Sequence, residues 1–124
     1  MIASYRDLKV WQEAMALAEG AYHLTAILPK TRANALAEQM CRSAISVPAN
    51  IAEGYGREST RSYIQFLRIA RGSLNELETQ ILLAQRLRFV DFTQTAVLLA
   101  SVEATSKMLN GLIRSLREKN RAPA

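Results

Sequence analysis

Arginines recur along one stretch of the chain at spacings that suit contact with phosphate groups. Of the sixteen basic residues twelve are arginine, whose planar guanidinium group binds phosphate oxygens and stacks on bases. If a helix runs through this stretch, four arginines lie within about 80° of one another around the helix axis. They are Arg57, Arg61, Arg68 and Arg71. This spacing, with Asn75 in the same sector, predicts a basic stripe that contacts a nucleic acid. The alternative is a solvated helix face paired with Glu58, Glu76 or Glu78.

Two further groups extend the predicted interface. Tyr55 lies in a predicted loop beside Arg57, where its ring would be free to stack on a base. A second basic cluster lies at the C-terminal end and consists of Arg114, Arg117, Lys119 and Arg121. We take Arg114 and Arg117 as candidate contacts with nucleic acid. The alternative is that this cluster complements the helix dipole or frays as a basic tail.

Residues suited to catalysis or metal binding are sparse. His23 is the single histidine and Cys41 the single cysteine, and neither has the spacing of a metal-ligand cluster or of a nucleophile and its base. Glu76 and Glu78 are two residues apart on a predicted helix, so they point in different directions and do not form a carboxylate pair. We therefore predict no catalytic residue, no metal site, no cofactor and no enzymatic activity.

A proline interrupts a helical pattern in the middle of the chain. Pro48 has no amide hydrogen to bond the carbonyl of Ala44, which in a helix interior costs roughly 3 kcal/mol and bends the axis. The short side chains of Ser46 and Asn50 are predicted to bond the carbonyl groups that this break leaves free. The carboxylate of Glu53 is predicted to accept hydrogen bonds from unpaired backbone amides. Gly54 and Gly56 are predicted to adopt a left-handed conformation and so to end the helix.

These residues are part of a wider resemblance. The segments Tyr5 to Gln12, Ser46 to Arg57 and Phe66 to Glu78 together resemble the four-helix bundle proteins encoded in intervening sequences of bacterial 23S rRNA genes. The resemblance implies an antiparallel four-helix bundle, a ring-like homopentamer, and relatedness to Avd, the accessory protein of diversity-generating retroelements. It also implies nucleic acid and a reverse transcriptase as partners, bound through a basic surface of the pentamer.

Length and composition predict one soluble domain spanning residues 1–124. The chain has 124 residues, of which 49% are hydrophobic, and a formal net charge of +5, which suits a single buried core. The longest stretch without a charged residue, Phe92 to Val102, falls short of the roughly 18 apolar residues that a membrane span needs. Charged residues interrupt the early apolar positions and Cys41 has no disulfide partner, so we expect a cytoplasmic protein without a signal segment.

Breaks in the pattern divide the chain into four helical segments, predicted at 5–28, 34–54, 59–88 and 91–119. Asn34, Ser59 and Asp91 are predicted N-caps, and Asp91 with Gln94 has the spacing of a capping box. The heptad spacing within the segments favours bundle packing at about +20°. The predicted fold class is all-α, an antiparallel up-down four-helix bundle with a proline-kinked second helix.

Apolar residues three and four positions apart predict one buried face on each segment. The first face consists of Leu8, Trp11, Met15, Ala18, Tyr22 and Thr25. The second consists of Leu36, Met40, Ala44, Val47 and Ile51. The third consists of Tyr63, Leu67, Ala70, Leu74, Leu77, Ile81 and Ala84. The fourth consists of Thr95, Leu98, Val102, Thr105, Leu109, Leu112 and Leu116.

Further apolar residues lie away from these faces on the last two segments, namely Ile64, Ile69, Leu82, Leu83, Leu99, Met108 and Ile113. They predict a second buried surface, which is either a wider hydrophobic core within the subunit or an interface between subunits. Because the resemblance points independently to a ring, we favour the interface.

Together these features predict a non-enzymatic, oligomeric helical bundle that binds RNA or another nucleic acid through an arginine-rich surface. The alternative function is a scaffold that docks a protein partner, such as the reverse transcriptase of a retroelement, as an Avd-like accessory protein does.

Overall fold

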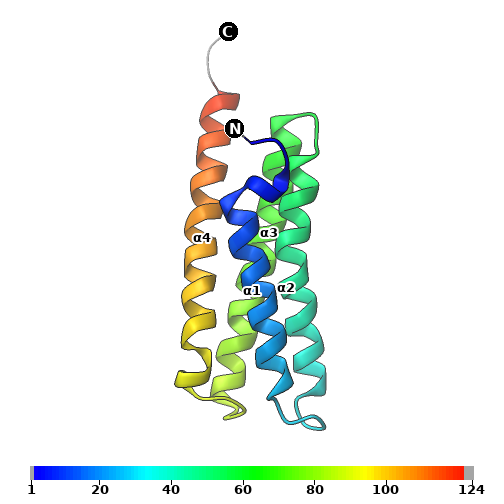
Figure 1. Cartoon of the computed structure of the whole chain (residues 1–124), viewed down its shortest axis with the longest axis vertical. Helices are drawn as coiled ribbons and strands as arrows, with labels where there is room; N and C mark the ends of the chain where they lie inside the picture. Colours follow the sequence, from blue (N-terminus) through cyan, green and yellow to red (C-terminus); the bar gives the residue numbers. More distant parts are fainter. Residues whose placement is uncertain (1, 122–124) are drawn as a thin grey trace.

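The computed structural model describes residues 2–121, and every regular element within them is a helix. A short 3-10 helix, η1 (Tyr5–Asp7), is followed by α1 (Lys9–Ala26), α2 (Asn34–Tyr55), α3 (Thr60–Arg86) and α4 (Phe92–Asn120). Consecutive long helices run in opposite directions along the long axis of the molecule (Figure 1). The predicted all-helical class with four long helices is confirmed.

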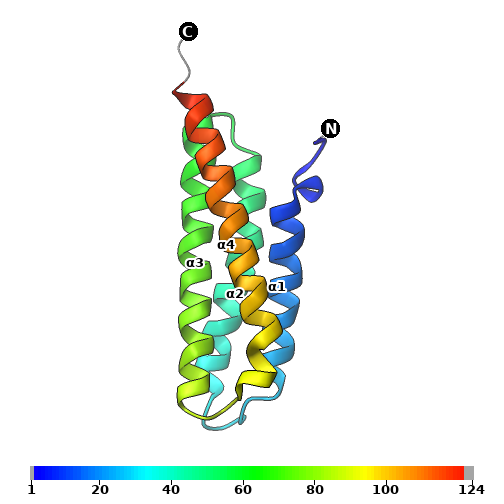
Figure 2. The ribbon, with the colours of Figure 1, turned by 90° about the vertical axis from the view of Figure 1, so that its left-hand side faces the viewer.

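Each long helix packs against two neighbours. α1 contacts α2 and α4, and α3 contacts the same two helices, so α1 and α3 occupy opposite corners of the bundle. Figure 2 shows α4 inclined across the side of the bundle between α3 and α1. The most extensive contact is between α2 and α3. One end of the bundle holds the start of α3 and the end of α4, and the opposite end holds the connection between them (Figure 1).

The core confirms the predicted buried faces of α2, α3 and α4. Their fully buried large side chains are Met40, Val47, Ile51, Leu67, Leu74, Leu77, Ile81 and Leu109. Two threonines of α4, Thr95 and Thr105, are buried among them. The hydroxyl of Thr105 donates to the carbonyl of Ser101 at 2.8 Å, so this polar group is satisfied within its own helix.

The predicted buried face of α1 is wrong by one residue. Met15 and Tyr22 are 38% and 49% exposed. The residues that α1 buries are Val10, Ala14, Leu17, Ala21 and Leu24. A shift of one residue rotates the face by about 100°. Beside this face α1 approaches α4 at Gly20, where a Cβ atom would be 3.1 Å from Cδ1 of Leu98.

Two of the three predicted N-caps are confirmed. The hydroxyl of Ser59 accepts a hydrogen bond from the amide of Ser62 at 3.1 Å. Asp91 and Gln94 form the predicted capping box, with two reciprocal bonds of 2.9 Å. Asn34 is not a cap, because α2 begins at this residue and the N-cap position belongs to Ala33, whose side chain has no acceptor.

Pro48 is buried inside α2. The side-chain amide of Asn50 donates to the carbonyl and the hydroxyl of Ser46, at 2.8 and 2.9 Å, and the Ser46 hydroxyl lies 2.7 Å from that of Ser73 on α3. These side chains therefore bond one another and link α2 to α3, rather than bonding the carbonyl of Ala44 that the proline leaves free. The predicted bend of α2 at Pro48 stays a prediction.

Pro48→Ala is expected to leave the fold intact and to straighten α2. Alanine restores the amide that bonds the carbonyl of Ala44, which recovers up to roughly 3 kcal/mol, while the missing ring atoms leave a small cavity that offsets part of this gain. Circular dichroism should show unchanged helix content, and the thermal midpoint should be equal to that of the parent or higher. A clearly lower midpoint would show that packing of the proline ring outweighs the missing hydrogen bond.

The two glycines after Pro48 do not turn the chain left-handed, as the sequence had predicted. Neither has a positive φ, and Gly56 ends α2 in the right-handed region at φ −79°. Gly54 is buried where α2 meets α3, and a Cβ atom there would lie 2.9 Å from Cβ of Phe66 and 3.2 Å from the carbonyl oxygen of Tyr63. Gly54 therefore permits close packing of the two helices rather than a turn.

The apolar residues outside the predicted faces belong to two groups. Ile64 and Ile113 are buried within the bundle, so the prediction of a subunit interface is wrong for these two. Leu99 is partly buried against the core. The exposed members of the set are Ile69, Leu82, Leu83 and Met108. These four remain available for contact with another molecule.

Among residues 2–121 the two most exposed large apolar side chains lie on α4, and these are Phe92 at 78% and Val97 at 83%. Within the described part of the chain α4 alone is long and apolar enough to cross a membrane, with a mean hydropathy of 1.2 over an 18-residue window that is 28% buried. The sequence estimate considered only the uninterrupted charge-free stretch and missed this window. A single such helix carries little weight, because packed helices of bundles meet the same criterion.

Candidate nucleic-acid interface

The two predicted basic clusters lie together at one end of the bundle. Because α3 begins where α4 ends (Figure 1), Arg61 and Arg68 of α3 line the same hollow as Arg117 and Arg121, which lie at the end of α4. This hollow has a volume of about 260 Å³, and its other lining residues are Ile64, Gln65 and Asn120. We call the four arginines and the concave surface that they line the basic hollow.

The basic hollow has no carboxylate partner among residues 2–121. The ion pairs of this part of the chain join Arg57 to Glu53 at 2.8 Å and Lys107 to Glu103 at 3.3 Å. The alternative prediction paired the arginine stripe with Glu58, Glu76 or Glu78. None of these three carboxylates forms an ion pair with an arginine of the stripe. Four positive charges that line one concave surface without a carboxylate in contact favour the approach of a polyanion.

Arg57 lies outside the basic hollow. Its guanidinium group pairs with the carboxylate of Glu53, and the guanidinium carbon is 4.5 Å from the centre of the Phe66 ring. Glu53 was predicted to bond unpaired amides near the proline, but it bonds Arg57 instead. These contacts hold the Arg57 side chain against the α2–α3 connection and leave it less free for a phosphate than the four arginines of the hollow.

Arg71 and Arg114 also lie outside the basic hollow. The guanidinium group of Arg71 donates to Oδ1 of Asn110 at 3.0 Å and so connects α3 to α4. Arg114 is exposed on α4 but is not among the residues that line the hollow. Both side chains add to the positive charge of this side of the molecule without forming part of the concave surface.

Tyr55 is the last residue of α2 and does not lie in a loop, as predicted. Its ring meets that of Tyr63 edge to face, with 6.1 Å between the ring centres. Burial raises the pKa of Tyr63 to about 12, and the neighbouring Tyr55 phenol contributes to the rise. The predicted loop position of Tyr55 is therefore wrong, and its role in stacking on a base stays a prediction.

Comparison with known proteins gives the chain its family. The sequence matches the 23S rRNA-intervening sequence protein family over residues 6–111, from η1 to most of α4. The chain belongs to this family. The matched span includes Arg61 and Arg68 but ends before Arg117 and Arg121. Two of the four arginines of the basic hollow therefore lie beyond the part of the chain that matches the 23S rRNA-intervening sequence proteins.

A solved structure supports the fold of this 23S rRNA-intervening sequence protein. It is the crystal structure of a protein of unknown function from the S23 ribosomal protein family of Bacteroides thetaiotaomicron VPI-5482, with 24% sequence identity and a TM-score of 0.78. The alignment covers 84% of this chain and 97% of that one. At this identity the similarity shows a shared fold. No curated protein matches the sequence.

Side chains suited to catalysis remain apart in this family member. His23 is exposed on α1, and Sγ of Cys41 lies 3.6 Å from Oγ1 of Thr25. Across residues 2–121 no three side chains of His, Cys, Asp or Glu gather where they could hold a metal ion. The basic hollow gathers four arginines on one concave surface, an arrangement suited to binding a polyanion.

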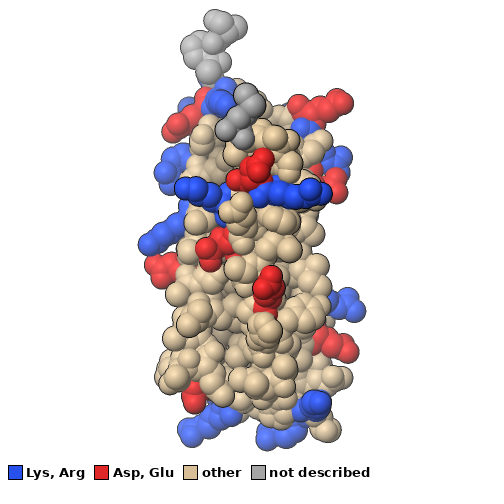
Figure 3. All heavy atoms as spheres, in the orientation of Figure 1, with Lys and Arg blue, Asp and Glu red and all other residues tan. Residues whose placement is uncertain are grey.

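Basic residues also gather at the opposite end of the molecule, which the sequence interpretation missed. Figure 3 shows Lys and Arg concentrated toward both ends of the face that it presents, with mainly acidic and uncharged side chains between them. The connection between α3 and α4 borders a second hollow of about 580 Å³, lined in part by Arg86, Arg88 and Phe92. The only sequence signal was the close spacing of these residues, and the fold was needed to show that they share a cavity.

Proposed function

We propose that this 23S rRNA-intervening sequence protein is a non-enzymatic protein that binds RNA through the basic hollow. The observation that carries this proposal is the convergence of four arginines on one concave surface with no carboxylate partner in the described chain. A guanidinium group donates two parallel hydrogen bonds to phosphate oxygens, and each neutralised phosphate releases counterions. The family's association with 23S rRNA makes RNA the first polymer to test.

The proposal includes assembly of the protein into a homo-oligomer in the cytoplasm, with a pentameric ring as the form that the family resemblance implies. Apolar side chains that could contact another subunit are exposed on α3 and α4, and these are Ile69, Leu82, Leu83 and Met108. A ring would repeat the basic hollow, so one RNA would bind at several points and the effective concentration would raise the overall affinity.

A scaffold that docks a protein partner is the second candidate function. The observation that favours it is a groove of about 440 Å³ between α3 and α4, lined in part by the apolar side chains of Leu74, Leu82 and Leu99. Grooves of this kind accept apolar side chains of a partner protein. In the Avd-like form of this proposal the partner is the reverse transcriptase of a retroelement, and contacts with nucleic acid are secondary.

Arg61→Glu/Arg68→Glu is expected to weaken RNA binding and to flatten its salt dependence. The affinity of the parent for a structured RNA should fall steeply with salt, with a slope of about 0.9 in log K against log salt for each phosphate contact. The double variant removes two such contacts, so its slope should be smaller by about 2. Fluorescence anisotropy titrations at several salt concentrations measure this slope, and a length-matched duplex DNA in parallel measures the preference between the two polymers.

Arg42→Glu is the matched control for the single variant Arg68→Glu. Arg42 is exposed on α2, away from the basic hollow, and its replacement changes the net charge by the same amount. Its slope should stay close to that of the parent. An equal loss of RNA affinity in Arg42→Glu and Arg68→Glu would show that net charge causes the effect and would contradict binding at the basic hollow. Absence of RNA and DNA binding by the parent at low salt would exclude nucleic-acid binding and leave the scaffold as the function.

A further inference from the structure

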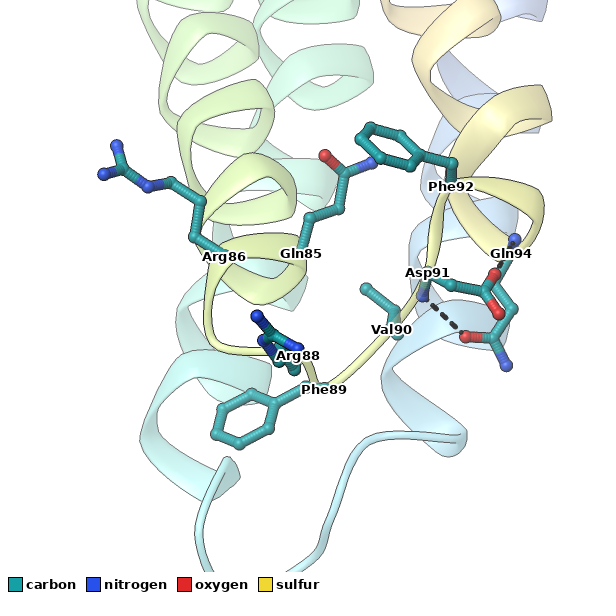
Figure 4. A pocket seen from close by; sticks show the side chains of 8 residues that line it. All are labelled: Gln85, Arg86, Arg88, Phe89, Val90, Asp91, Phe92 and Gln94. Carbon is teal, nitrogen blue, oxygen red and sulfur yellow. Dashed lines mark hydrogen bonds between the residues drawn. The ribbon is translucent and has the colours of Figure 1, made fainter.

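The end of the bundle opposite the basic hollow contains a second concave surface, the larger of the two. Its volume is about 580 Å³, and eight consecutive or nearly consecutive residues line it, namely Gln85, Arg86, Arg88, Phe89, Val90, Asp91, Phe92 and Gln94. Figure 4 shows these side chains around the connection from α3 to α4. A volume of this size is in the range of small-ligand sites. We call it the loop hollow.

Arg88 has a backbone conformation that arginine adopts at a cost. Its φ is 63°, in the left-handed region, where it is the only residue other than glycine with a positive φ in the described chain. The amide of Phe89 donates to the carbonyl of Ala84 and the amide of Arg88 to that of Gln85, both at 2.9 Å. These two bonds define a Schellman motif at the end of α3, with Arg88 at the position where glycine is the usual residue. Folding alone would therefore favour glycine at this position over an arginine.

Phe92 is also poorly explained by folding. It is the first residue of α4, and 78% of its surface is exposed although phenylalanine is usually buried. In Figure 4 its ring extends from α4 toward Gln85 of α3, on the side of the loop hollow away from the basic residues. Figure 4 also shows Arg88 below the end of α3, beside Phe89, and the Arg86 side chain extending away from Phe92 on the outer side of α3. The Phe92 ring and the Arg88 guanidinium group therefore line the loop hollow from α4 and from the connection after α3.

Asp91 and Phe89, the other charged and aromatic residues that line the loop hollow, already have partners. The carboxylate of Asp91 accepts from the amide of Gln94 at 2.9 Å in the capping box of α4. The guanidinium carbon of Arg32 lies 5.5 Å from the centre of the Phe89 ring and covers it. Arg86 and Arg88 have no carboxylate partner among the described residues. An anionic group would therefore bind on the α3 side of the hollow, away from Asp91.

We propose that the loop hollow binds an unpaired nucleotide of single-stranded RNA, with its base stacked on Phe92 and its phosphate on Arg88. This inference rests on the proposed function because it assumes that the ligand is RNA. It differs from it by placing a binding site at the opposite end of the molecule and by requiring single-stranded RNA. Stacking on an aromatic ring requires a base that is free of its neighbours, which a continuous duplex does not offer. The basic hollow has no aromatic lining residue and binds phosphates of either form.

The test compares a single-stranded RNA that contains 2-aminopurine with the duplex of the same sequence. Phe92→Ala is expected to lower the single-strand affinity about 5- to 150-fold, as loss of one stacked base does, and to abolish the fluorescence change that accompanies stacking. Its duplex affinity should stay within about twofold of the parent, since the basic hollow is intact. Val97→Ala is the matched control, because Val97 is an exposed apolar residue of the same helix and does not line the loop hollow.

Arg88→Gly provides an independent test with two opposed readouts. Glycine relieves the left-handed conformation, so the thermal midpoint should rise by about 3 °C. Loss of one phosphate contact should at the same time lower the single-strand affinity and reduce its salt slope by about 0.7. An Arg88→Gly variant that is more stable and binds single-stranded RNA as the parent does would overturn the proposal, because the arginine would then have no role in binding.

Other outcomes separate this inference from the proposed function. If Arg61→Glu/Arg68→Glu loses affinity for both RNA forms while Phe92→Ala changes neither, the basic hollow binds RNA and the loop hollow does not. If light scattering shows that Phe92→Ala changes the mass of the oligomer, Phe92 contacts another subunit and the nucleotide site is excluded. If the parent binds neither RNA form at low salt, both proposals fall.

Discussion

Replacement of Ile51 by aspartate is expected to unfold the protein. Ile51 lies on α2 and has no exposed surface, at 0%. Truncation of a buried isoleucine costs about 2–5 kcal/mol, and an unpaired buried carboxylate adds to this cost because it must be protonated or hydrated. The free energy of unfolding of a typical domain is only about 5–15 kcal/mol. Far-UV circular dichroism should show loss of the helical signal, or a thermal midpoint far below that of the parent.

Ile45→Asp is the control for this prediction. Ile45 lies on the same helix and is 48% exposed, so aspartate there keeps its hydration. This variant should retain the helical signal and a midpoint close to that of the parent. If Ile51→Asp melts as the parent does, the assignment of Ile51 to the core is wrong, and so is the predicted buried face of α2.

Gly54→Leu is expected to force α2 away from α3 and to lower the free energy of unfolding by more than about 3 kcal/mol, the upper end of the usual cost of overpacking. The first added atom alone would lie 2.9 Å from Cβ of Phe66, 3.1 Å from Cδ1 of Tyr63 and 3.2 Å from the Tyr63 carbonyl oxygen. That oxygen belongs to the backbone of α3 and cannot rotate away. Urea unfolding, with its midpoint and slope, measures the loss.

Gly72→Leu shows whether close packing is the cause. Apart from the neighbouring residues and backbone of α3 itself, no described atom lies within 4 Å of a Cβ placed at Gly72. Leucine is a better helix former than glycine by nearly 1 kcal/mol, so this variant should be neutral or more stable than the parent. If both leucine variants are destabilised equally, the close approach of α2 to α3 at Gly54 is not what requires glycine.

Local spacing along the chain was sufficient to predict the helices and three of their buried faces. On α3 the buried apolar residues are three and four positions apart, so they lie on one side of the helix whatever packs against them. They are Leu67, Ala70, Leu74, Leu77 and Ile81. Ser59 and Asp91 cap their helices through bonds to residues three positions further on, which are also local. The predicted arginine stripe of α3 depended on the same periodicity.

α1 and Gly54 show where local spacing was insufficient. On α1 two apolar faces one residue apart both have helical spacing, and the larger side chains Met15 and Tyr22 favoured the wrong one. The packing of α1 against α2 and α4 decided between them, because it buries Leu17 and Leu24 and leaves Met15 and Tyr22 exposed. Gly54 was predicted to allow a turn, but the proximity of Phe66 to it arises only from the packing of α2 on α3.

The sequence by itself determined that Arg61 and Arg68 lie on the same face of α3, about two turns apart, because 3.6 residues make one turn, and that Arg117 and Arg121 belong to a basic cluster at the C-terminal end. Only the tertiary structure decided that the two pairs line one hollow without a described carboxylate partner. The physical reason is that separation along the chain sets distances within a helix. Distances between helices depend on which faces pack and how closely, and those contacts form only when the whole bundle buries its core.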